Sequence, residues 1–144
     1  MTAPVPFVVF VAVTLGASIY LSVAKRRRLK RYWARSCTGR AWLNEFPAAQ
    51  SDAVRRFLYL FVDSFGFSRK RALQFVPGDR PLAVYRALYP LKSMPDALEF
   101  EAFAKGVEAT YGLNLIRIWR EDITLGEVFA KTTAAVCAAS QLHR

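Results

Sequence analysis

Few side chains in this sequence combine the chemistry and the spacing that catalysis or metal binding requires. The two cysteines, Cys37 and Cys137, are 100 positions apart, and the single histidine, His143, is the penultimate residue. They do not have the ligand spacing of a zinc site. Cys–His and Ser–His–Asp catalysis need a base beside the nucleophile, and no two carboxylates stand at a useful spacing. We therefore expect no metal site and no enzymatic activity.

Residues 96–99 have the clearest signal for the start of a helix. Asp96 precedes Glu99 by three residues, which is the spacing of a capping box at the start of a helix. The free N–H groups and the dipole of such a start attract phosphate. The apolar face of this helix would comprise Phe100, Phe103, Ala104, Val107 and Tyr111. Gly112 predicts the end of the helix, because glycine readily adopts the left-handed conformation found there.

Other segments must position this helix. Ser51 and Asp52 offer an N-cap for a helix that runs to Phe65, and Gly66 is its predicted stop. The apolar face of that helix would comprise Val54, Phe57, Leu58, Phe61 and Phe65. Short helical turns are expected at 69–76 and 81–88, the second with a proline in its first turn.

The C-terminal segment predicts a third main helix. Residues 113–118 are expected to form a short extended connection, and Thr124 and Glu127 then repeat the capping-box spacing. The apolar positions of the last helix are Leu125, Val128, Phe129 and Val136. No run of five or more residues alternates between apolar and polar, which argues against a sheet. The predicted fold class is all-α, a small up-and-down bundle of three main helices.

Residues 96–128 resemble the second half of acyl carrier proteins. In that family an Asp-Ser-Leu motif opens helix II, an aromatic residue ends it, and an Ile-Thr-Thr-Val-like element opens the last helix. This chain has Asp96-Ala97-Leu98-Glu99, then Tyr111, then Ile123-Thr124, without a gap over 33 residues. The chain is most similar to the divergent acyl-carrier-like bacterial family DUF1493. Any helix–loop–helix with capped ends would share part of this pattern.

The resemblance implies a phosphopantetheine arm on the serine of the motif, but this chain has Ala97 there. A methyl group cannot form the phosphodiester, so we expect no cofactor. Ser93 is a displaced alternative, although it precedes Pro95 and lies outside the predicted helix start. Without an arm the domain would be a non-catalytic module that binds a protein partner. The alternative is a functional acyl or aminoacyl carrier for a membrane-associated synthase.

Acidic residues at the start of this helix are the candidate partner-binding site. Acyl carriers present an acidic helix II to their enzymes, and the equivalent residues here are Asp96, Glu99 and Glu101. A solvated helix face that offsets the dipole would look the same. The sequence does not identify the partner protein.

The N-terminal segment predicts a membrane span. Residues 5–24 carry no charge, and roughly 20 apolar residues are enough for a helix to cross the hydrocarbon core. A cleaved signal peptide would instead place its positive charge before the apolar run and end in small residues. The basic residues that follow the run are Lys25, Arg26, Arg27, Arg28, Lys30 and Arg31. They predict a cytoplasmic C-terminal domain, an N-terminus outside, and contact with anionic lipid headgroups.

The net charge of +10 arises almost entirely from this basic segment. Residues 25–40 hold eight basic and no acidic side chains, whereas residues 41–144 hold thirteen basic and eleven acidic ones. A nucleic-acid-binding domain would carry its basic patch on the folded part, so we expect no nucleic-acid partner. Trp33 and Trp42 are expected at the bilayer interface, where indole rings are favoured. Trp119 is expected to be a core or lid aromatic.

These observations predict a single-pass protein of the bacterial inner membrane. A transmembrane helix (1–24) would be followed by a basic juxtamembrane stalk (25–44) and an acyl-carrier-like helical domain (45–144). Its partners would be the lipid bilayer and a protein.

Overall fold

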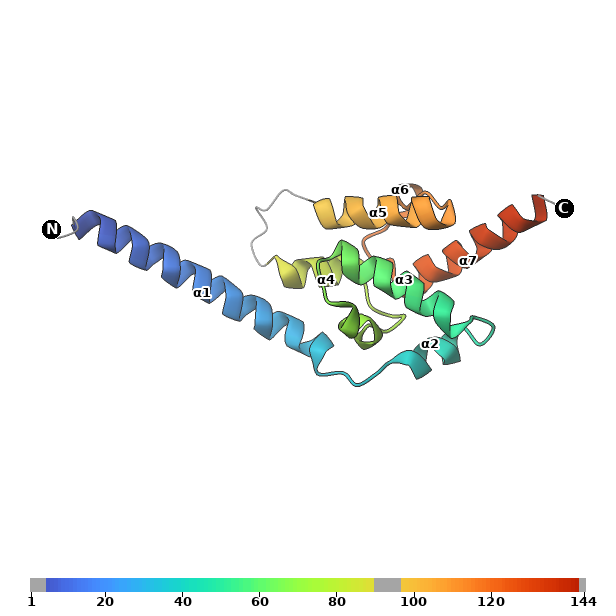
Figure 1. Ribbon diagram of the computed structural model, residues 1–144, viewed down its shortest axis with the longest axis horizontal. Helices are drawn as coiled ribbons and strands as arrows, with labels where there is room; N and C mark the ends of the chain where they lie inside the picture. The colour runs from blue at the N-terminus through green and yellow to red at the C-terminus, as the bar shows by residue number, and fades with distance from the viewer. Residues whose placement is uncertain (1–4, 90–96, 143–144) are drawn as a thin grey trace.

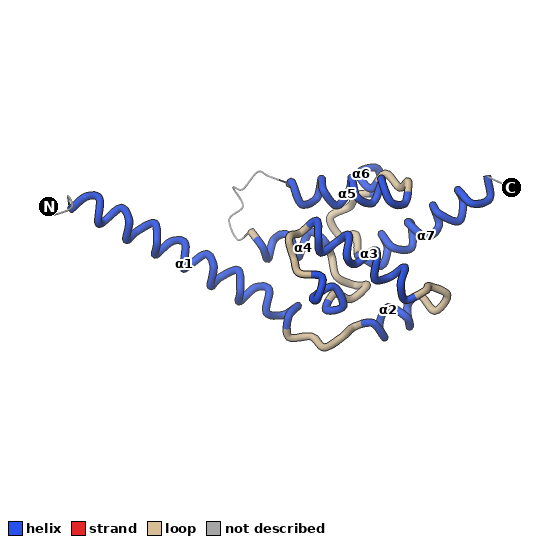
Figure 2. The backbone as a smooth tube through the Cα atoms, viewed as in Figure 1, coloured by secondary structure: helices blue, strands red, loops and turns tan. Residues whose placement is uncertain are grey.

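Every regular element in the part of the chain that the computed structural model describes, residues 5–89 and 97–142, is a helix (Figure 1, Figure 2). In chain order the elements are α1 (Val5–Trp33), α2 (Gly39–Glu45), α3 (Ser51–Ser64), the 3-10 helix η1 (Arg69–Gln74), α4 (Pro81–Leu88), α5 (Leu98–Tyr111), α6 (Leu115–Ile118) and α7 (Leu125–Leu142). The predicted all-helical class is therefore confirmed.

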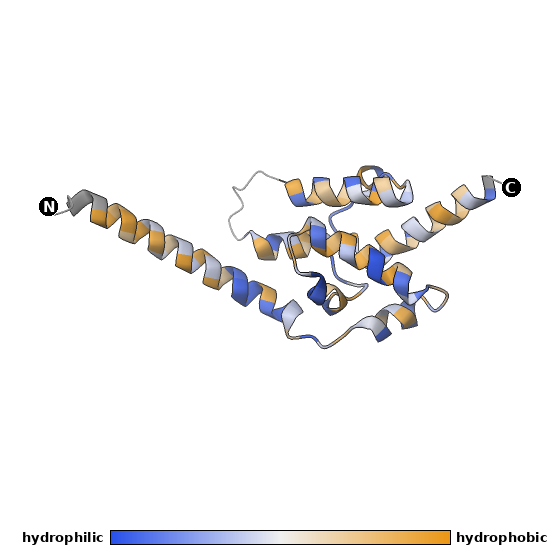
Figure 3. Cartoon of the chain, in the orientation of Figure 1, coloured by the Kyte–Doolittle hydropathy of each residue, from blue (hydrophilic) through white to orange (hydrophobic). Residues whose placement is uncertain are grey.

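Helix α1 projects from the other helices, and its two halves differ in character. Figure 3 shows an apolar N-terminal half that passes into a strongly hydrophilic segment. Among the described residues, α1 alone is long and apolar enough to cross a membrane. Phe10 is 67% exposed and Tyr20 is 73% exposed. By length and composition alone, this half could be a membrane anchor or a signal sequence.

The C-terminal end of α1 belongs to the core of the domain. Leu29 and Tyr32 are buried, and the Trp33 ring meets Phe67 and Phe75 edge-on, with centroids 5.1 and 5.7 Å apart. The helix continues without a break through the basic residues to Trp33. The segment predicted to be a stalk therefore supplies part of the core.

Trp42, on α2, lies at the centre of the domain rather than at a membrane interface. It is fully buried, and its indole Nε1 donates a hydrogen bond of 2.8 Å to the carbonyl oxygen of Phe75. The ring also packs against Phe46, Phe57 and Phe129. The interfacial prediction is wrong for Trp42, because the core satisfies both the apolar ring and its N–H group.

An ion pair joins the end of α1 to the loop before α4. Arg35 donates two hydrogen bonds to the carboxylate of Asp79, at 2.5 and 3.1 Å. Asp79 is buried and also accepts from the backbone N–H of Val76 at 2.8 Å. Arg35 lies in the segment predicted to be a basic stalk (25–44), but it forms an ion pair within the folded domain.

Helices α3 and α5 pack against each other as their apolar faces predict. Phe103 on α5 contacts Phe57 and Phe61 on α3, with ring centroids 6.1 and 5.4 Å apart. Gly66 and Gly112 follow α3 and α5 with φ of +67°, the left-handed conformation predicted at both ends. The apolar residues of the core are Leu29, Tyr32, Trp42, Val54, Phe57, Leu58, Phe61, Val62, Phe65, Ala72, Phe75, Val84, Ala87, Leu88, Phe103, Val107, Leu115, Ile123, Leu125, Val128 and Phe129.

Two local predictions are wrong. The connection expected to be extended contains the one-turn helix α6, because the side chain of Asn114 accepts a hydrogen bond from the N–H of Arg117 and caps it. Val136, expected on the apolar face of the last helix, is 45% exposed. The C-terminal half of α7 extends beyond the packed helices (Figure 1), so no neighbour covers that face.

Candidate functional site

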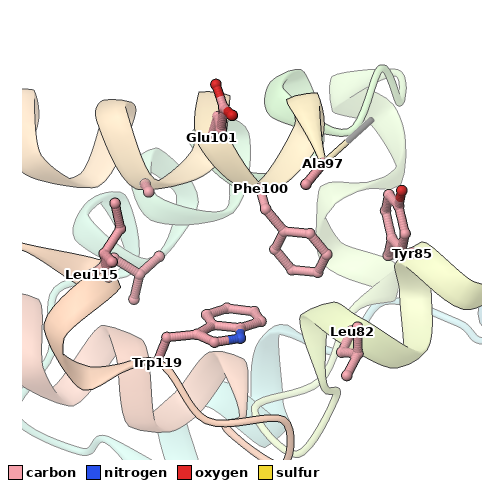
Figure 4. A pocket seen from close by; sticks show the side chains of 9 residues that line it. Leu82, Tyr85, Ala97, Phe100, Glu101, Leu115 and Trp119 are labelled. Atoms are coloured by element: carbon pink, nitrogen blue, oxygen red, sulfur yellow. The ribbon is translucent and has the colours of Figure 1, made fainter. Parts of the chain in front are cut away.

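An apolar pocket of about 520 Å³ opens between α4, α5 and α6 (Figure 4). Its lining residues are Leu82, Tyr85, Ala97, Phe100, Glu101, Ala104, Leu115, Ile116 and Trp119. Figure 4 shows the Phe100 and Trp119 side chains next to each other in the pocket lining. Their rings are in edge-to-face contact, with centroids 4.7 Å apart. Apart from Glu101, these side chains present apolar or aromatic surface, so the pocket suits an apolar group.

Ala97 lies at the N-terminal end of α5, on the rim of this pocket. It is the N-cap residue, and its carbonyl oxygen accepts from the N–H of Glu101 at 2.9 Å. Asp96, the predicted cap, lies outside the described residues, and the helix itself begins at Leu98. The methyl group of Ala97 makes no cap hydrogen bond. Ala97 is therefore exposed at the start of α5 and offers only a methyl group.

The three predicted partner-binding acids have different surroundings. Glu101 lines the pocket, is exposed, and pairs weakly with Lys105 at 3.8 Å. Glu99 is half-buried and accepts a hydrogen bond from the hydroxyl of Tyr89, at the end of α4. Asp96 lies outside the described residues, as does Ser93. Of the acids that the structure describes, Glu101 is therefore the one that a ligand in the pocket would meet.

The start of α5 lies close to the base of the apolar half of α1. A hollow of about 420 Å³ is lined by Lys25 of α1 together with Leu98 and Glu99 of α5. Leu98 is 64% exposed. Because Lys25 is the first charge after the apolar run, the start of α5 sits at the level where that run ends.

The six predicted membrane-surface residues all lie exposed on α1. They are Lys25, Arg26, Arg27, Arg28, Lys30 and Arg31. One of them is held in place, because a guanidinium N–H of Arg31 donates to the hydroxyl of Tyr32 at 2.6 Å. The same guanidinium lies 4.7 Å from the Tyr32 ring centroid. Arg27, Arg28 and Arg31 also border α4, where a second hollow is found.

The sequence did not single out Ile116, and it did not place Trp119 in a pocket. Ile116 is 75% exposed at the pocket, and it lies on α6, a helix that the sequence did not predict. Trp119 was expected to be a core or lid aromatic, and it packs partly buried against the core. The cap at Asn114 was the one signal that could have revealed α6, because asparagine favours helix starts.

The remaining reactive side chains form no site. Cys37 and Cys137 are both exposed free thiols. Within residues 5–89 and 97–142 no group of three His, Cys, Asp or Glu side chains is placed to hold a metal ion. His143 lies outside the described residues.

Comparison with known proteins gives no relative from which a role could be carried over. No family model matches the chain, and neither a curated protein nor a solved structure matches it.

Proposed function

We propose that this chain is a membrane-anchored, non-catalytic helical module with an acyl-carrier-like fold, which binds a protein partner at the cytoplasmic face of the membrane. The observation that carries the proposal is Ala97 at the exposed start of α5. A carrier needs a hydroxyl at this position to hold its arm. The methyl group leaves the surrounding helices available for binding but not for thioester chemistry.

The pocket beside Ala97 supports a binding role. Ile116 presents an exposed apolar side chain at its edge, and Glu101 adds one negative charge. A partner segment with an apolar side chain and a neighbouring Lys or Arg would match both. Burying an apolar side chain in such a pocket is worth about 1.5–3 kcal/mol. Complementary charge would add specificity and speed association.

Helix α1 supports the proposed membrane anchor. Its apolar half is exposed and long enough to span the hydrocarbon core, and the basic residues after it favour a cytoplasmic location for the domain. The start of α5 lies near Lys25, so a partner bound there would meet the membrane surface. Carbonate extraction should leave the chain in the membrane fraction, and a C-terminal alkaline phosphatase fusion should be inactive. An active fusion would reverse the orientation.

Intact-mass spectrometry tests the non-catalytic role. The chain purified from its host, or co-expressed with a promiscuous phosphopantetheinyl transferase, should keep its unmodified mass. A gain of about 340 Da, the size of a phosphopantetheinyl group added to a serine hydroxyl, would refute the proposal. Ala97→Ser should be modified slowly at best, because the described acids near it are few and one is bonded to Tyr89.

Site-specific photo-crosslinking tests the partner surface. A photoreactive residue in place of Ile116 should give one discrete crosslinked product in host membranes. The same residue at Ala130, an exposed position on α7, is the matched control and should give none. Glu101→Lys should weaken the Ile116 product, because it reverses the charge at the pocket. Equal labelling from both positions would show that the pocket is not the partner surface.

A functional acyl carrier is the second candidate. One observation favours it, the apolar pocket of about 520 Å³ beside the position aligned with the arm-bearing serine. A pocket of this size falls in the range of small-ligand sites. The mass measurement above separates the two candidates, since a carrier must be modified at some hydroxyl.

A further inference from the structure

A basic groove of about 550 Å³ lies between the C-terminal part of α1 and helix α4. Its lining residues are Arg27, Arg28, Arg31, Ala83, Arg86 and Ala87. Four of the six side chains are guanidinium groups, three from α1 and one from the folded domain. Ala83 and Ala87 are one turn apart on α4, and their small side chains leave the space between the two helices open.

The guanidinium groups suit phosphate. Arginine presents N–H donors in a planar fork that matches two phosphate oxygens at once. Arg31 is already positioned by its contacts with Tyr32. Arg86 also pairs with Glu121 at 3.5 Å, but both side chains are highly exposed and such pairs are weak. Its five N–H donors allow it to hold that carboxylate and a phosphate together.

The groove lies at the depth of lipid headgroups if α1 spans the bilayer. At about 1.5 Å of rise per residue, Arg27 is roughly 5 Å and Arg31 roughly 10 Å beyond Ala24, where the apolar run ends. The headgroup region on each side of the hydrocarbon core is about 5–8 Å thick. Arg27 and Arg28 therefore lie within this layer. Arg31 starts just beyond it, but helical side chains tilt toward the N-terminus of the helix, so its long side chain is directed back toward the layer. Arg86 would approach a lipid phosphate from the domain side.

We propose that this groove binds the headgroup of an anionic phospholipid that carries two phosphates, of the cardiolipin type. Four guanidinium groups, opposed by the one carboxylate of Glu121, match two phosphates better than one. The inference rests on the proposed membrane anchor. It assigns Arg86, outside the basic segment, to lipid recognition, and it implies selection among anionic lipids rather than general attraction.

Native mass spectrometry of the full chain from detergent micelles tests the proposal. With cardiolipin added, the chain should retain one molecule, and twice the concentration of phosphatidylglycerol, which carries the same total charge, should be retained less. Arg86→Gln should weaken cardiolipin binding about fivefold, the equivalent of one basic contact. Arg117→Gln removes the same charge from an exposed site on α6, and it should change binding less than twofold.

Three outcomes would overturn the proposal. Equal retention of the two lipids, or equal weakening by the two variants, would mean that the basic charge acts without a defined site. The third test measures the binding of inorganic pyrophosphate to the chain in neutral phosphatidylcholine nanodiscs. If it binds as tightly as cardiolipin and with the same dependence on Arg86, the ligand is a soluble phosphate compound. Carbonate extraction reports on the anchor separately, so a failed anchor and a failed groove give different results.

Discussion

The starts of α5 and α7 differ although the sequence gives both the same spacing of a capping box. At α7 the hydroxyl of Thr124 accepts from the N–H of Glu127 at 3.2 Å, and the carboxylate of Glu127 accepts from the N–H of Thr124 at 2.9 Å. At α5 the cap is Ala97, without any side-chain bond. Two side-chain hydrogen bonds hold the start of α7, whereas the described N-cap residue of α5, beside the pocket, offers only a methyl group.

Backbone hydrogen bonds to a neighbouring loop also hold the start of α7. The N–H groups of Leu125 and Gly126 donate to the carbonyls of Asp79 and Pro77, both at 2.8 Å, so the first turn of α7 is bound to the loop before α4. An unsatisfied helix start is a natural place for ligands or partners to bind. The contrast therefore shows that the first turn of α7 is held by side-chain and backbone hydrogen bonds, whereas the N-cap residue of α5 contributes only a methyl group.

The largest expected effect is at Asp79, which supports the α7 side of the comparison. Asp79→Ala removes both hydrogen bonds from Arg35 and the acceptor of the Val76 N–H. Breaking a fully buried ion pair costs about 3–5 kcal/mol, but the Arg35 side chain is 31% exposed, so water can solvate it once Asp79 is removed. The expected loss is therefore about 1–3 kcal/mol, the cost of leaving buried hydrogen-bonding groups unpaired, against a typical total stability of about 5–15 kcal/mol. Urea unfolding of the full chain in detergent should show the loss.

Asp63→Ala is the matched control for that experiment. Asp63 pairs with Arg69 at 2.7 Å, but both side chains are well exposed, and an exposed pair is worth about 0–1 kcal/mol. Similar losses from the two variants would mean that Asp79 is no more important to the fold than a surface carboxylate.

A smaller loss is expected from Thr124→Ala. Removing an N-cap hydroxyl costs about 0.5–2 kcal/mol, and Thr124→Ser should restore most of it because serine caps as well. Thr133→Ala removes a hydroxyl from the middle of the same helix, where it bonds only the carbonyl of Ala130, and should have little effect. Thermal unfolding of the three variants measures the difference. A neutral Thr124→Ala would remove the distinction between the two helix starts.

The pH dependence of unfolding should also reveal the contribution of Glu127 to the capping box at the start of α7. The backbone N–H of Thr124, and then Arg120, hold the pKa of Glu127 below its ordinary value of 4.5. A lowered pKa in the folded state means stability that is present above the unfolded pKa and lost as the pH falls through the folded value. The parent should therefore exceed Glu127→Gln in unfolding temperature near pH 7. The gap should shrink steadily below about pH 4.5, and parallel curves from pH 7 to 3 would contradict this.

The sequence predicted those parts of the fold whose signals are local. The helix ends at Gly66 and Gly112, the cap at Thr124 and the apolar faces of α3 and α5 all follow from residues within one or two turns. The structure has each of them as predicted.

Features that depend on distant contacts were not predicted. Trp42 follows a basic segment in the sequence, so it was expected at the membrane interface. Its place in the core depends on packing against Phe46, Phe57 and Phe129. The pocket at Ala97 needs α6, a single turn that periodicity cannot reveal. The groove at Arg86 needs α4 beside α1. Ala97 could be singled out from the sequence, but the pocket around it could not.

The smallest expected effect is at Ala97 itself. Its φ of −80° and ψ of 29° differ from the extended conformation usual for an N-cap. A side-chain oxygen placed there would therefore not reach the N–H groups of the first turn as that of Thr124 does. Ala97→Asp should gain only from its charge at the positive end of the helix dipole, about 0.3–1 kcal/mol.

Ala109→Asp, at an exposed position in the last turn of α5, is the control, because there the dipole opposes the same charge and stability should fall. Chemical denaturation of the two variants at low salt decides between two views of α5. If Ala97→Asp raises the stability slightly and Ala109→Asp lowers it, the backbone conformation keeps the start of α5 uncapped, as expected of a surface that binds a partner. A gain well above 1 kcal/mol from Ala97→Asp would mean that the start rearranges to accept a cap. The two helix starts would then differ by little more than one side chain.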